Sequence, residues 1–253
     1  MTDLEDAARR ALACLDLTNL DDDCNEAAID ALIERAVTPY GSVAAICIWP
    51  RFVSYARARL APDVKIATVV NFPTGTESDE DVIAMTEQAI IDGADEIDMV
   101  IPWRALLEGS PEQIPARVER VKRAAGDARV KAILETGVLE DADLIRRASD
   151  LALEGGADFI KTSTGKVAVN ATLSAAEIML EAIRDHDPSC GFKAAGGIRT
   201  TQDAANYLDA ADRIMGLGWA DPQHFRIGAS SVLTALIATL NGDDDDAVAA
   251  EGY

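Results

Sequence analysis

One lysine in a short apolar segment has the properties of a nucleophile. Lys161 lies within Asp158-Phe-Ile-Lys-Thr-Ser-Thr-Gly-Lys166, which predicts a short buried strand that runs into a glycine turn. Burial strips water from an ammonium group, so a lysine at this place must be paired or lose its proton. A deprotonated lysine is an amine that attacks carbonyl carbons to form Schiff bases. A lysine that reaches solvent and stays charged would explain the same segment without chemistry.

Two more lysines and one aspartate are expected near Lys161, at the ends of the predicted strands. Lys166 follows the same strand, and Lys193 lies in Gly191-Phe-Lys-Ala-Ala-Gly-Gly-Ile-Arg199 among neighbours that leave it poorly solvated. Two ammonium groups in one dry pocket repel each other, so we expect Lys193 to lower the pKa of Lys161. Asp98 offers the acid–base group that carbinolamine dehydration and carbon–carbon bond cleavage both need.

Strand-like segments alternate with amphipathic helical patterns after an N-terminal helical region that ends near Thr38. The predicted strands are 43–49, 65–71, 96–101, 130–135, 158–163, 191–195, 212–215 and 225–229. The predicted helices between them are 79–92, 114–125, 142–154, 174–184 and 201–208. Eight strands that alternate with helices predict an α/β fold in which a parallel sheet closes into a (β/α)8 TIM barrel. No Gly/Ser/Pro-rich linker divides the chain, so we predict one domain over residues 1–240.

The predicted barrel ends in a different kind of segment. Residues 241–253 begin Asn-Gly-Asp-Asp-Asp-Asp, continue with small residues and end at Tyr253. So few apolar side chains cannot form a packed core, and we expect a flexible acidic tail.

A short repeat supports the barrel. Its copies are Gly93-Ala-Asp-Glu-Ile-Asp98, Gly156-Ala-Asp-Phe-Ile-Lys161 and Ala210-Ala-Asp-Arg-Ile-Met215, on the third, fifth and seventh predicted strands. Each copy follows a helical pattern and is expected to open a strand. Alternate strands of such a barrel point side chains into the same interior layers. The repeat therefore predicts that Asp98 and Lys161 occupy equivalent inward positions.

Two glycine-rich turns are typical of phosphate sites. Gly196 and Gly197 follow one predicted strand, with Arg199 close behind, and Gly228-Ala-Ser-Ser231 leads from the last strand into an apolar helix. A helix N-terminus with free amides and nearby serine hydroxyls binds anions, and barrels often hold phosphate near their last loops. Each turn alone is a common connection between two secondary-structure elements. Together they predict a phosphate site beside the three lysines.

The overall charge limits the classes of partner. The chain has 44 acidic and 23 basic residues and a formal net charge of −21. This charge repels nucleic acid and anionic membranes, so we expect neither as a partner. Its six lysines and seventeen arginines leave a surface rich in carboxylates and poor in lysine. Such a surface suits concentrated salt, which screens self-repulsion, and an ordinary acidic cytosolic enzyme could carry it as well.

Cysteines and histidines indicate neither disulfides nor a metal centre. Cys14, Cys24, Cys47 and Cys190 show no C-x-x-C pair, and the chain has only two histidines. The N-terminus is acidic and unlike a targeting signal, and no apolar run is long enough to span a bilayer. We expect a cytoplasmic protein with free thiols, and neither a metal nor a cofactor.

Several segments spread along the chain share the pattern of one enzyme family. They are Asp16-Leu-Thr18, Ala44-Ala-Ile-Cys-Ile-Trp-Pro-Arg51, Val70-Asn-Phe-Pro73, Gly93–Val100, Leu134-Glu-Thr-Gly137, Gly156–Asn170, Gly191–Thr200 and Arg226–Ser231. Together they cover essentially the whole chain, which resembles the deoxyribose-phosphate aldolases, and most of all their enterobacterial-type branch. The sequence departs from that branch at Ala194, where Pro is usual, at Trp103, where Tyr is usual, and in its run of tail aspartates.

The resemblance implies a class I aldolase, a lyase of deoxyribonucleoside catabolism. Such an enzyme reversibly cleaves 2-deoxy-D-ribose 5-phosphate to D-glyceraldehyde 3-phosphate and acetaldehyde. It implies that Lys161 forms the Schiff base, that Lys193 perturbs its amine and that Asp98 relays protons. Asp16 would brace this network, and Thr18 would lie near the substrate.

The resemblance also implies roles for residues outside this network. Tyr253 would assist proton transfer at the enamine carbon, and Cys47 would lie near the site. The phosphate would be held by Gly165, Lys166, Gly196, Gly197, Arg199, Gly228, Ser230 and Ser231.

Two alternative functions remain. Another Schiff-base barrel, such as a transaldolase, would transfer a larger ketose fragment, but the pair Lys161 and Lys193 argues against it. A phosphosugar-binding regulator without catalysis would be expected to lack Lys161, Lys193 or Asp98, and all three are present. The partners expected of the aldolase are small phosphorylated sugars and aldehydes, and a homodimer is compatible with the sequence.

Overall fold

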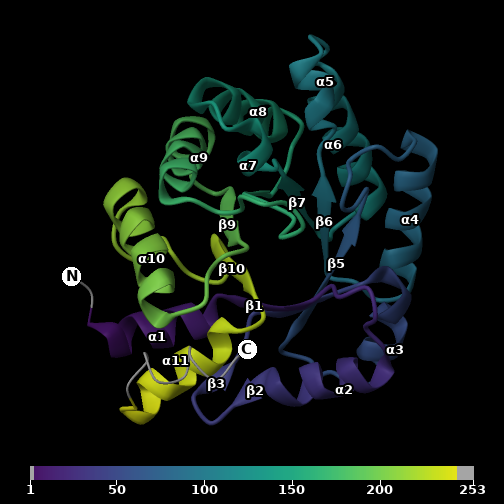
Figure 1. Cartoon of the computed structure of the whole chain (residues 1–253). Coiled ribbons are helices and arrows are strands. Elements are labelled where there is room, and N and C mark those ends of the chain that lie inside the picture. Colours follow the sequence, from purple (N-terminus) through teal and green to yellow (C-terminus); the bar gives the residue numbers. More distant parts are fainter. Residues whose placement is uncertain (1–2, 244–253) are drawn as a thin grey trace.

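The computed structural model describes residues 3–243 as a closed barrel of eight parallel strands surrounded by helices (Figure 1). In their order round the barrel, the strands are β1 (Leu15–Asn19), β10 (Phe225–Ala229), β9 (Gly191–Ala195), β8 (Phe159–Lys161), β7 (Arg129–Ile133), β6 (Glu96–Val100), β5 (Lys65–Val70) and β4 (Ala45–Ile48). A separate antiparallel pair joins β2 (Val37–Thr38) to β3 (Gly41–Ser42). The prediction of a TIM barrel is confirmed.

Helices of very different lengths follow the barrel strands along the chain. They are α2 (Glu26–Arg35), the 3-10 helix Pro50–Phe52 followed by α3 (Val53–Arg57), α4 (Asp79–Ile91), α5 (Trp103–Leu107), α6 (Gln113–Ala125), α7 (Thr136–Leu139), α8 (Ala142–Glu154), α9 (Leu173–His186), α10 (Thr201–Met215) and α11 (Val232–Asn241). Side-chain oxygens of Ser78, Asp141, Thr172 and Thr200 cap the N-termini of α4, α8, α9 and α10, which explains where these four helices begin.

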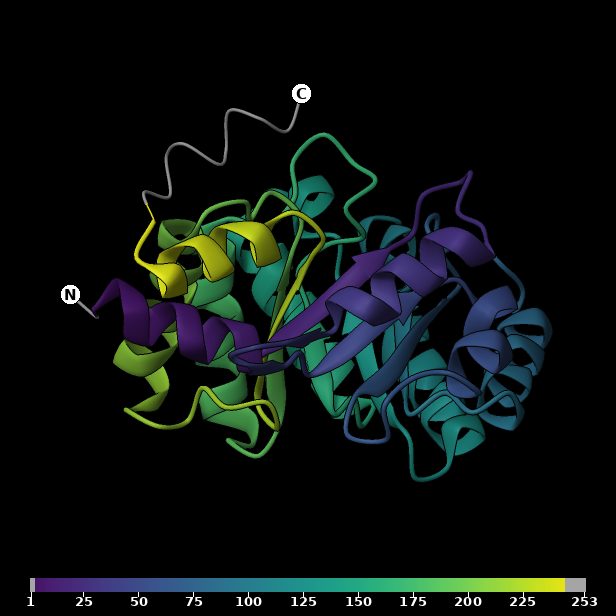
Figure 2. The same cartoon turned by 90° about the horizontal axis from the view of Figure 1, so that it is seen from below.

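The N-terminal helix α1 (Leu4–Ala13) precedes the barrel and packs against α10 and α11 (Figure 2). Within residues 3–243 the first helix, α1, therefore lies beside the last helix, α11. No helix within residues 3–243 is long and apolar enough to cross a lipid bilayer.

Two predicted element assignments are wrong. The N-terminal region is not helical up to Thr38, because Leu15–Asn19 forms strand β1, which pairs with β10 and β4. Residues 212–215 are not a strand, because they form the last turn of α10. The predicted number of barrel strands was correct only because the two errors cancel.

The third copy of the repeat does not open a strand, because it lacks the first glycine of the other two copies. Gly93 follows α4 and Gly156 follows α8, with φ of 101° and 87°, a conformation that ends a helix readily only when there is no Cβ. The third copy has Ala210 at this position, so α10 continues to Met215 and ends at Gly216, whose φ is 98°. The two copies that open strands place Asp98 on β6 and Lys161 on β8, the fourth and sixth strands of the barrel.

Apolar side chains form two clusters on opposite faces of the strands. The larger one fills the layer between the barrel and its helices. The smaller one includes Cys47 on β4, Ala67 and Val69 on β5, and Ile133 on β7. Successive side chains of a strand point to opposite faces, so this smaller cluster lines the barrel interior. The interior therefore has an apolar side at β4 and β5.

Candidate active site

Lys161 ends strand β8 and reaches the floor of a pocket. Its register partners on the neighbouring strands are Ile133 and Lys193. Its Nζ donates a hydrogen bond to Oδ2 of Asp98 at 2.8 Å, and only 3% of the residue is exposed. Burial lowers the pKa of Lys161, Asp98 opposes this shift, and the ammonium of Lys193 adds to it. Lys161 is therefore the lysine in this site that gives up its proton most readily.

Lys193 is held in the opposite state. It is fully buried on β9, and its Nζ donates to Oδ2 of Asp16 at 2.5 Å and to Oδ2 of Asp98 at 2.7 Å. Burial alone would lower the pKa of Lys193, but the carboxylates of Asp16 and Asp98 outweigh burial and raise it. Lys193 thus keeps its charge beside Lys161.

Sequence reasoning missed three charged residues that complete this network. Lys131 on β7 donates to Oε2 of Glu96 at 2.5 Å and to Oδ1 of Asp98 at 2.9 Å. Arg226 on β10 donates from Nη1 to Oδ1 of Asp16 at 2.6 Å and from Nη2 to Oε1 of Glu96 at 2.7 Å. The sequence carried the same signal as at Lys161, because Lys131 and Arg226 each interrupt an apolar strand pattern.

The network keeps its carboxylates ionised. Burial would raise the pKa of Asp98, but the ammonium groups of Lys131, Lys161 and Lys193 outweigh it and hold this pKa well below the usual range. The pKa of Asp16 is lowered in the same way, chiefly by Lys193. Asp98 is consequently ionised in the resting state and accepts hydrogen bonds from all three lysines.

Gly228 has a packing role as well as the predicted place in a phosphate turn. A Cβ atom at this position would lie 2.9 Å from Cε of Lys193 and 3.1 Å from Cβ of Ala195. Because Gly228 has no side chain, Lys193 can cross the barrel interior towards Asp16 and Asp98.

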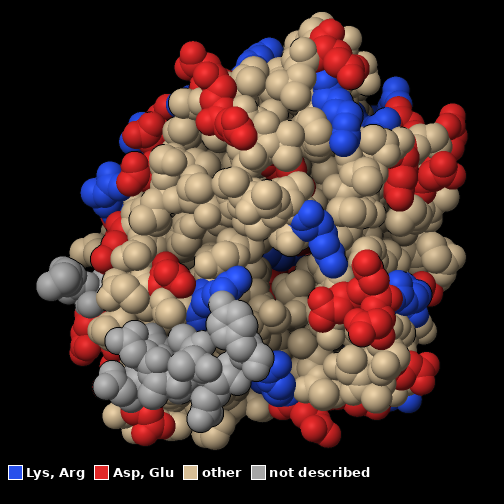
Figure 3. Space-filling view, viewed as in Figure 1, with Lys and Arg blue, Asp and Glu red and all other residues tan. Residues whose placement is uncertain are grey.

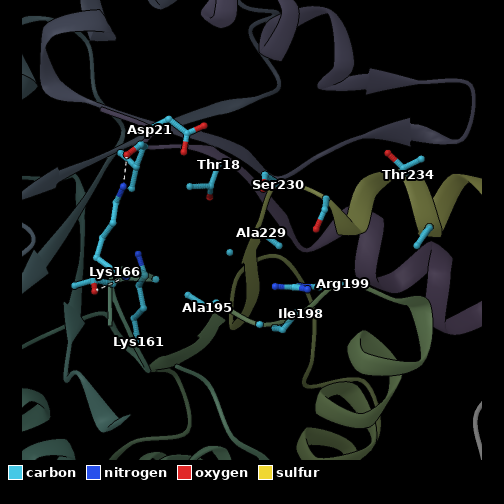
Figure 4. Close-up of a pocket in the computed structure, with 18 residues that line it drawn as sticks. Thr18, Asp21, Lys161, Lys166, Ala195, Ile198, Arg199, Ala229, Ser230 and Thr234 are labelled. Carbon is cyan, nitrogen blue, oxygen red and sulfur yellow. Dashed lines mark hydrogen bonds between the residues drawn. The ribbon is translucent and has the colours of Figure 1, made fainter. Parts of the chain in front are cut away.

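The pocket above Lys161 has a volume of about 770 Å³ and contains all the residues predicted to bind phosphate (Figure 4). Thr18 also lines it, with a hydroxyl that donates to the backbone oxygen of Asp16 at 2.8 Å. Lys161 and Lys166 lie on one side of the view and Arg199 on the other. The predicted phosphate residues in its wall are Gly165, Lys166, Gly196, Gly197, Arg199, Gly228, Ser230 and Ser231.

The rim of this pocket suits an anion. Ser231 is the N-cap of α11 and makes no side-chain cap hydrogen bond, so its exposed hydroxyl is available for a ligand. Lys166 is exposed and donates from Nζ to the backbone oxygen of Leu20 at 2.8 Å. In the space-filling view basic side chains lie round the hollow, and a group of acidic side chains lies on one side of it (Figure 3). Asp21 also lines the pocket. A helix N-terminus with cations beside it attracts phosphate.

A fourth missed residue, Glu135, shapes the loop that carries Lys166. It adopts a left-handed conformation with φ of 59° two residues after the end of β7. Its buried carboxylate accepts from the backbone N–H of Thr164 at 3.1 Å and from the Thr164 hydroxyl at 2.6 Å. The Thr164 hydroxyl in turn accepts from the backbone N–H of Lys166 at 3.1 Å.

Of two other predicted site residues, the structure describes Cys47 but not Tyr253. Cys47 is fully buried in the interior apolar cluster, and burial raises the pKa of its thiol. Tyr253 lies outside the described residues. Among residues 3–243, no group of three or more His, Cys, Asp or Glu side chains is placed to hold a metal ion.

Comparison with known proteins agrees with this geometry. The family model described as DeoC/LacD family aldolase matches residues 10–236. A deoxyribose-phosphate aldolase of Agrobacterium fabrum is 54% identical over 251 residues, which cover 98% of this chain and 96% of the relative.

Solved structures show the same likeness in three dimensions. A candidate deoxyribose-phosphate aldolase of Toxoplasma gondii ME49 superposes with a TM-score of 0.88 at 29% identity, over 95% of this chain and 98% of the other. The deoxyribose phosphate aldolase of Aeropyrum pernix, described as a unique tetramer, gives 0.75 at 26% identity, over 94% and 93%. With a family model that spans most of its length and a relative this similar, the chain belongs to the DeoC/LacD family of aldolases.

Proposed function

We propose that this protein reversibly cleaves 2-deoxy-D-ribose 5-phosphate to D-glyceraldehyde 3-phosphate and acetaldehyde through a Schiff base on Lys161. One observation carries the assignment of Lys161. Its amine lies at the floor of a pocket with an anion-binding rim, and its pKa is lowered while that of its neighbour Lys193 is raised.

The reaction begins when the neutral amine of Lys161 attacks C1, the aldehyde carbon of the open-chain sugar. The hydroxyl of the resulting carbinolamine receives a proton from Asp98 and leaves as water, which gives a protonated imine. Asp98 accepts a hydrogen bond from Nζ of Lys161 and is ionised, so it can take the proton that the amine releases on attack. Lys193, which is protonated and bonded to the same Asp98 oxygen, supplies positive charge beside this carboxylate.

Carbon–carbon cleavage then uses the iminium as an electron sink. Asp98 takes the proton of the C3 hydroxyl as the C2–C3 bond breaks, so that C3 becomes the aldehyde of glyceraldehyde 3-phosphate. The electron pair of the broken bond forms an enamine with C1 and C2. Protonation at C2 and hydrolysis of the imine release acetaldehyde and restore Lys161. We propose that the hydroxyl of Tyr253 delivers the proton to C2.

The phosphate group orients the substrate for this chemistry. We propose that it lies against the N-terminus of α11 at Ser231, with Arg199, Lys166 and the Gly196-Gly197 turn around it. Both glycines have φ of 85°, and a Cβ on Gly196 would lie 2.7 Å from Cβ of Asn170. The proposed contacts between the protein and the phosphate would hold the sugar with C1 directed at Lys161.

The expected domain, assembly and location follow from the same proposal. Residues 1–240 are proposed to be one catalytic domain and 241–253 an acidic tail. A homodimer is the proposed assembly, which sedimentation velocity would test. We also propose a cytoplasmic location, which the buried free thiols of Cys14, Cys24 and Cys47 favour.

The test is a coupled assay for glyceraldehyde 3-phosphate with deoxyribose 5-phosphate as the substrate. Turnover that disappears in Lys161→Met, with an unchanged thermal midpoint, supports the proposal. Transfer of a ketose fragment, or phosphosugar binding without cleavage, would point to the two alternative functions.

A further inference from the structure

The barrel interior contains an extended set of ionisable groups, and almost every strand contributes to it. Lys65 of β5 pairs with Asp95 and is half exposed, whereas the interior residues Ala67 and Val69 of that strand carry no charge. The groups that face Lys161 or its partners are Asp16 (β1), Cys47 (β4), Glu96 and Asp98 (β6), Lys131 (β7), Lys193 (β9) and Arg226 (β10).

The charges of this set balance in only one protonation state of Lys161. The cations Lys131, Lys193 and Arg226 all have raised pKa values, because neighbouring carboxylates outweigh their burial. Three buried carboxylates face these three cations. The set is therefore neutral when Lys161 is an amine and carries one excess positive charge when Lys161 is an ammonium. An excess charge in a buried region is unfavourable, so the balance favours the amine.

Arg226 and Glu96 belong to this set but take no part in the proposed reaction steps. Arg226 is 3% exposed and Glu96 2% exposed. Glu96 accepts from Arg226 at both carboxylate oxygens, at 2.7 and 3.0 Å, and from Lys131 at 2.5 Å. Arg226 also donates to Asp16 at 2.6 Å and from Nε to the backbone oxygen of Pro222 at 2.7 Å.

We propose that Arg226 and Glu96 are positioning residues that set the charge of the barrel interior so that Lys161 is the group left without a proton. This inference rests on the proposed role of Lys161 as the nucleophile.

Their influence reaches Lys161 through two shared partners. Lys131 divides its hydrogen bonds between Glu96 and Asp98, so loss of the Glu96 charge turns Lys131 further towards Asp98. Asp16 divides its interactions between Arg226 and Lys193, so loss of the Arg226 charge draws Lys193 towards Asp16 and away from Asp98. In the first case Asp98 stabilises a Lys161 ammonium less, and in the second case it stabilises it more.

The experiment measures the amine of Lys161 directly. Enzyme is incubated with acetaldehyde and cyanoborohydride over a range of pH, and the rate of ethylation at Lys161 is followed by peptide mass analysis. Glu96→Gln is expected to move the pH profile of this rate to lower pH, and Arg226→Met to higher pH, each by about one unit. The double variant, in which the charges balance again, is expected to return towards the wild-type profile.

Controls separate charge from packing. Arg226→Lys retains the charge and is expected to keep the wild-type profile, although it loses the two-pronged contact with Glu96. Glu177→Gln and Arg213→Met remove an exposed ion pair between α9 and α10 and should leave the profile unmoved. If Arg226→Met does not fold, Glu96→Gln and Arg226→Lys still decide the question.

Opposite shifts that cancel in the double variant cannot arise from a general loss of structure. Shifts in the same direction, or an unmoved Glu96→Gln profile, would overturn the charge-setting role. Wild-type enzyme that takes no label on Lys161 would instead overturn the proposed nucleophile. The two failures are therefore distinguishable.

Discussion

Lys161 and Lys193 lie directly opposite each other on neighbouring strands, and both donate to the same oxygen, Oδ2 of Asp98. Their environments differ in one respect, because Lys193 has a second carboxylate partner in Asp16, whereas within residues 3–243 Asp98 is the one carboxylate that pairs with Lys161. The pKa of Lys193 is consequently raised, and that of Lys161 is lowered. Two identical side chains thus take different roles from the number of carboxylates around them.

Replacing Lys193 should raise the pKa of Lys161. In Lys193→Leu the repelling ammonium is gone and Asp98 pairs more fully with Lys161, so the lysine holds its proton. A rise of about two pKa units leaves about a hundredth of the reactive amine at fixed pH. The pH–rate profile of the variant should move to higher pH, and a thermal melt should accompany it. A folded variant whose profile has not moved would show that Lys193 acts in another way.

A carboxylate at the N-terminus of α11 should compete with the substrate phosphate. Ser231→Glu should raise the KM for deoxyribose 5-phosphate at least tenfold and change that for unphosphorylated deoxyribose little, since about 1.4 kcal/mol corresponds to tenfold. Ser174→Glu adds the same charge in the first turn of α9, outside the pocket, and serves as the control. Equal losses on both substrates would contradict the phosphate role.

Gly228→Ala should damage the lysine network while leaving the α11 N-terminus in place. The new methyl group would meet Lys193 and Ala195, so Lys193 must shift from Asp16 and Asp98. We expect a loss of about 1–3 kcal/mol in the free energy of unfolding, as for other overpacked cores. The fall in kcat should be similar for phosphorylated and unphosphorylated sugars, which distinguishes this variant from Ser231→Glu. A selective effect on the phosphorylated sugar would argue against the packing role.

Tyr253→Phe removes one hydroxyl and tests its proposed role in proton transfer at the enamine carbon. We expect turnover to fall at least tenfold, while the thermal midpoint and trapping at Lys161 stay as in the wild type. Added salt should raise wild-type activity, because it screens the repulsion between the tail aspartates and the acidic barrel. Full activity of the variant at all salt concentrations would leave the tyrosine without a catalytic role.

The barrel could be predicted from periodicity alone, but the identity of its strands could not. Ala210-Ala-Asp-Arg-Ile-Met215 resembles the two strand-opening copies of the repeat, yet it begins with alanine where they begin with glycine, and the helix continues through it. Leu15–Asn19 was missed because this strand is short and follows α1 almost directly. Its partners β10 and β4 are distant in sequence, so no local pattern identifies it.

The two lysines near the pocket were easier to predict than the charged residues deeper in the barrel. Lys161 and Lys193 stand in segments with glycine turns, which local patterns reveal. Glu96, Lys131 and Arg226 gain their importance from one another, across strands far apart in the chain. Each looks like an isolated charge in an apolar strand until the barrel closes and brings them together.

Reductive trapping of the acetaldehyde complex tests the central claim most directly. Enzyme treated with acetaldehyde and borohydride, digested and mapped by mass spectrometry, should carry one ethyl group on Lys161, and Lys161→Met should carry none. The label should increase with pH as the amine fraction of Lys161 rises. A label on Lys193 or Lys166 instead, or wild-type enzyme with no label while it cleaves deoxyribose 5-phosphate, would contradict the assignment of Lys161 as the nucleophile.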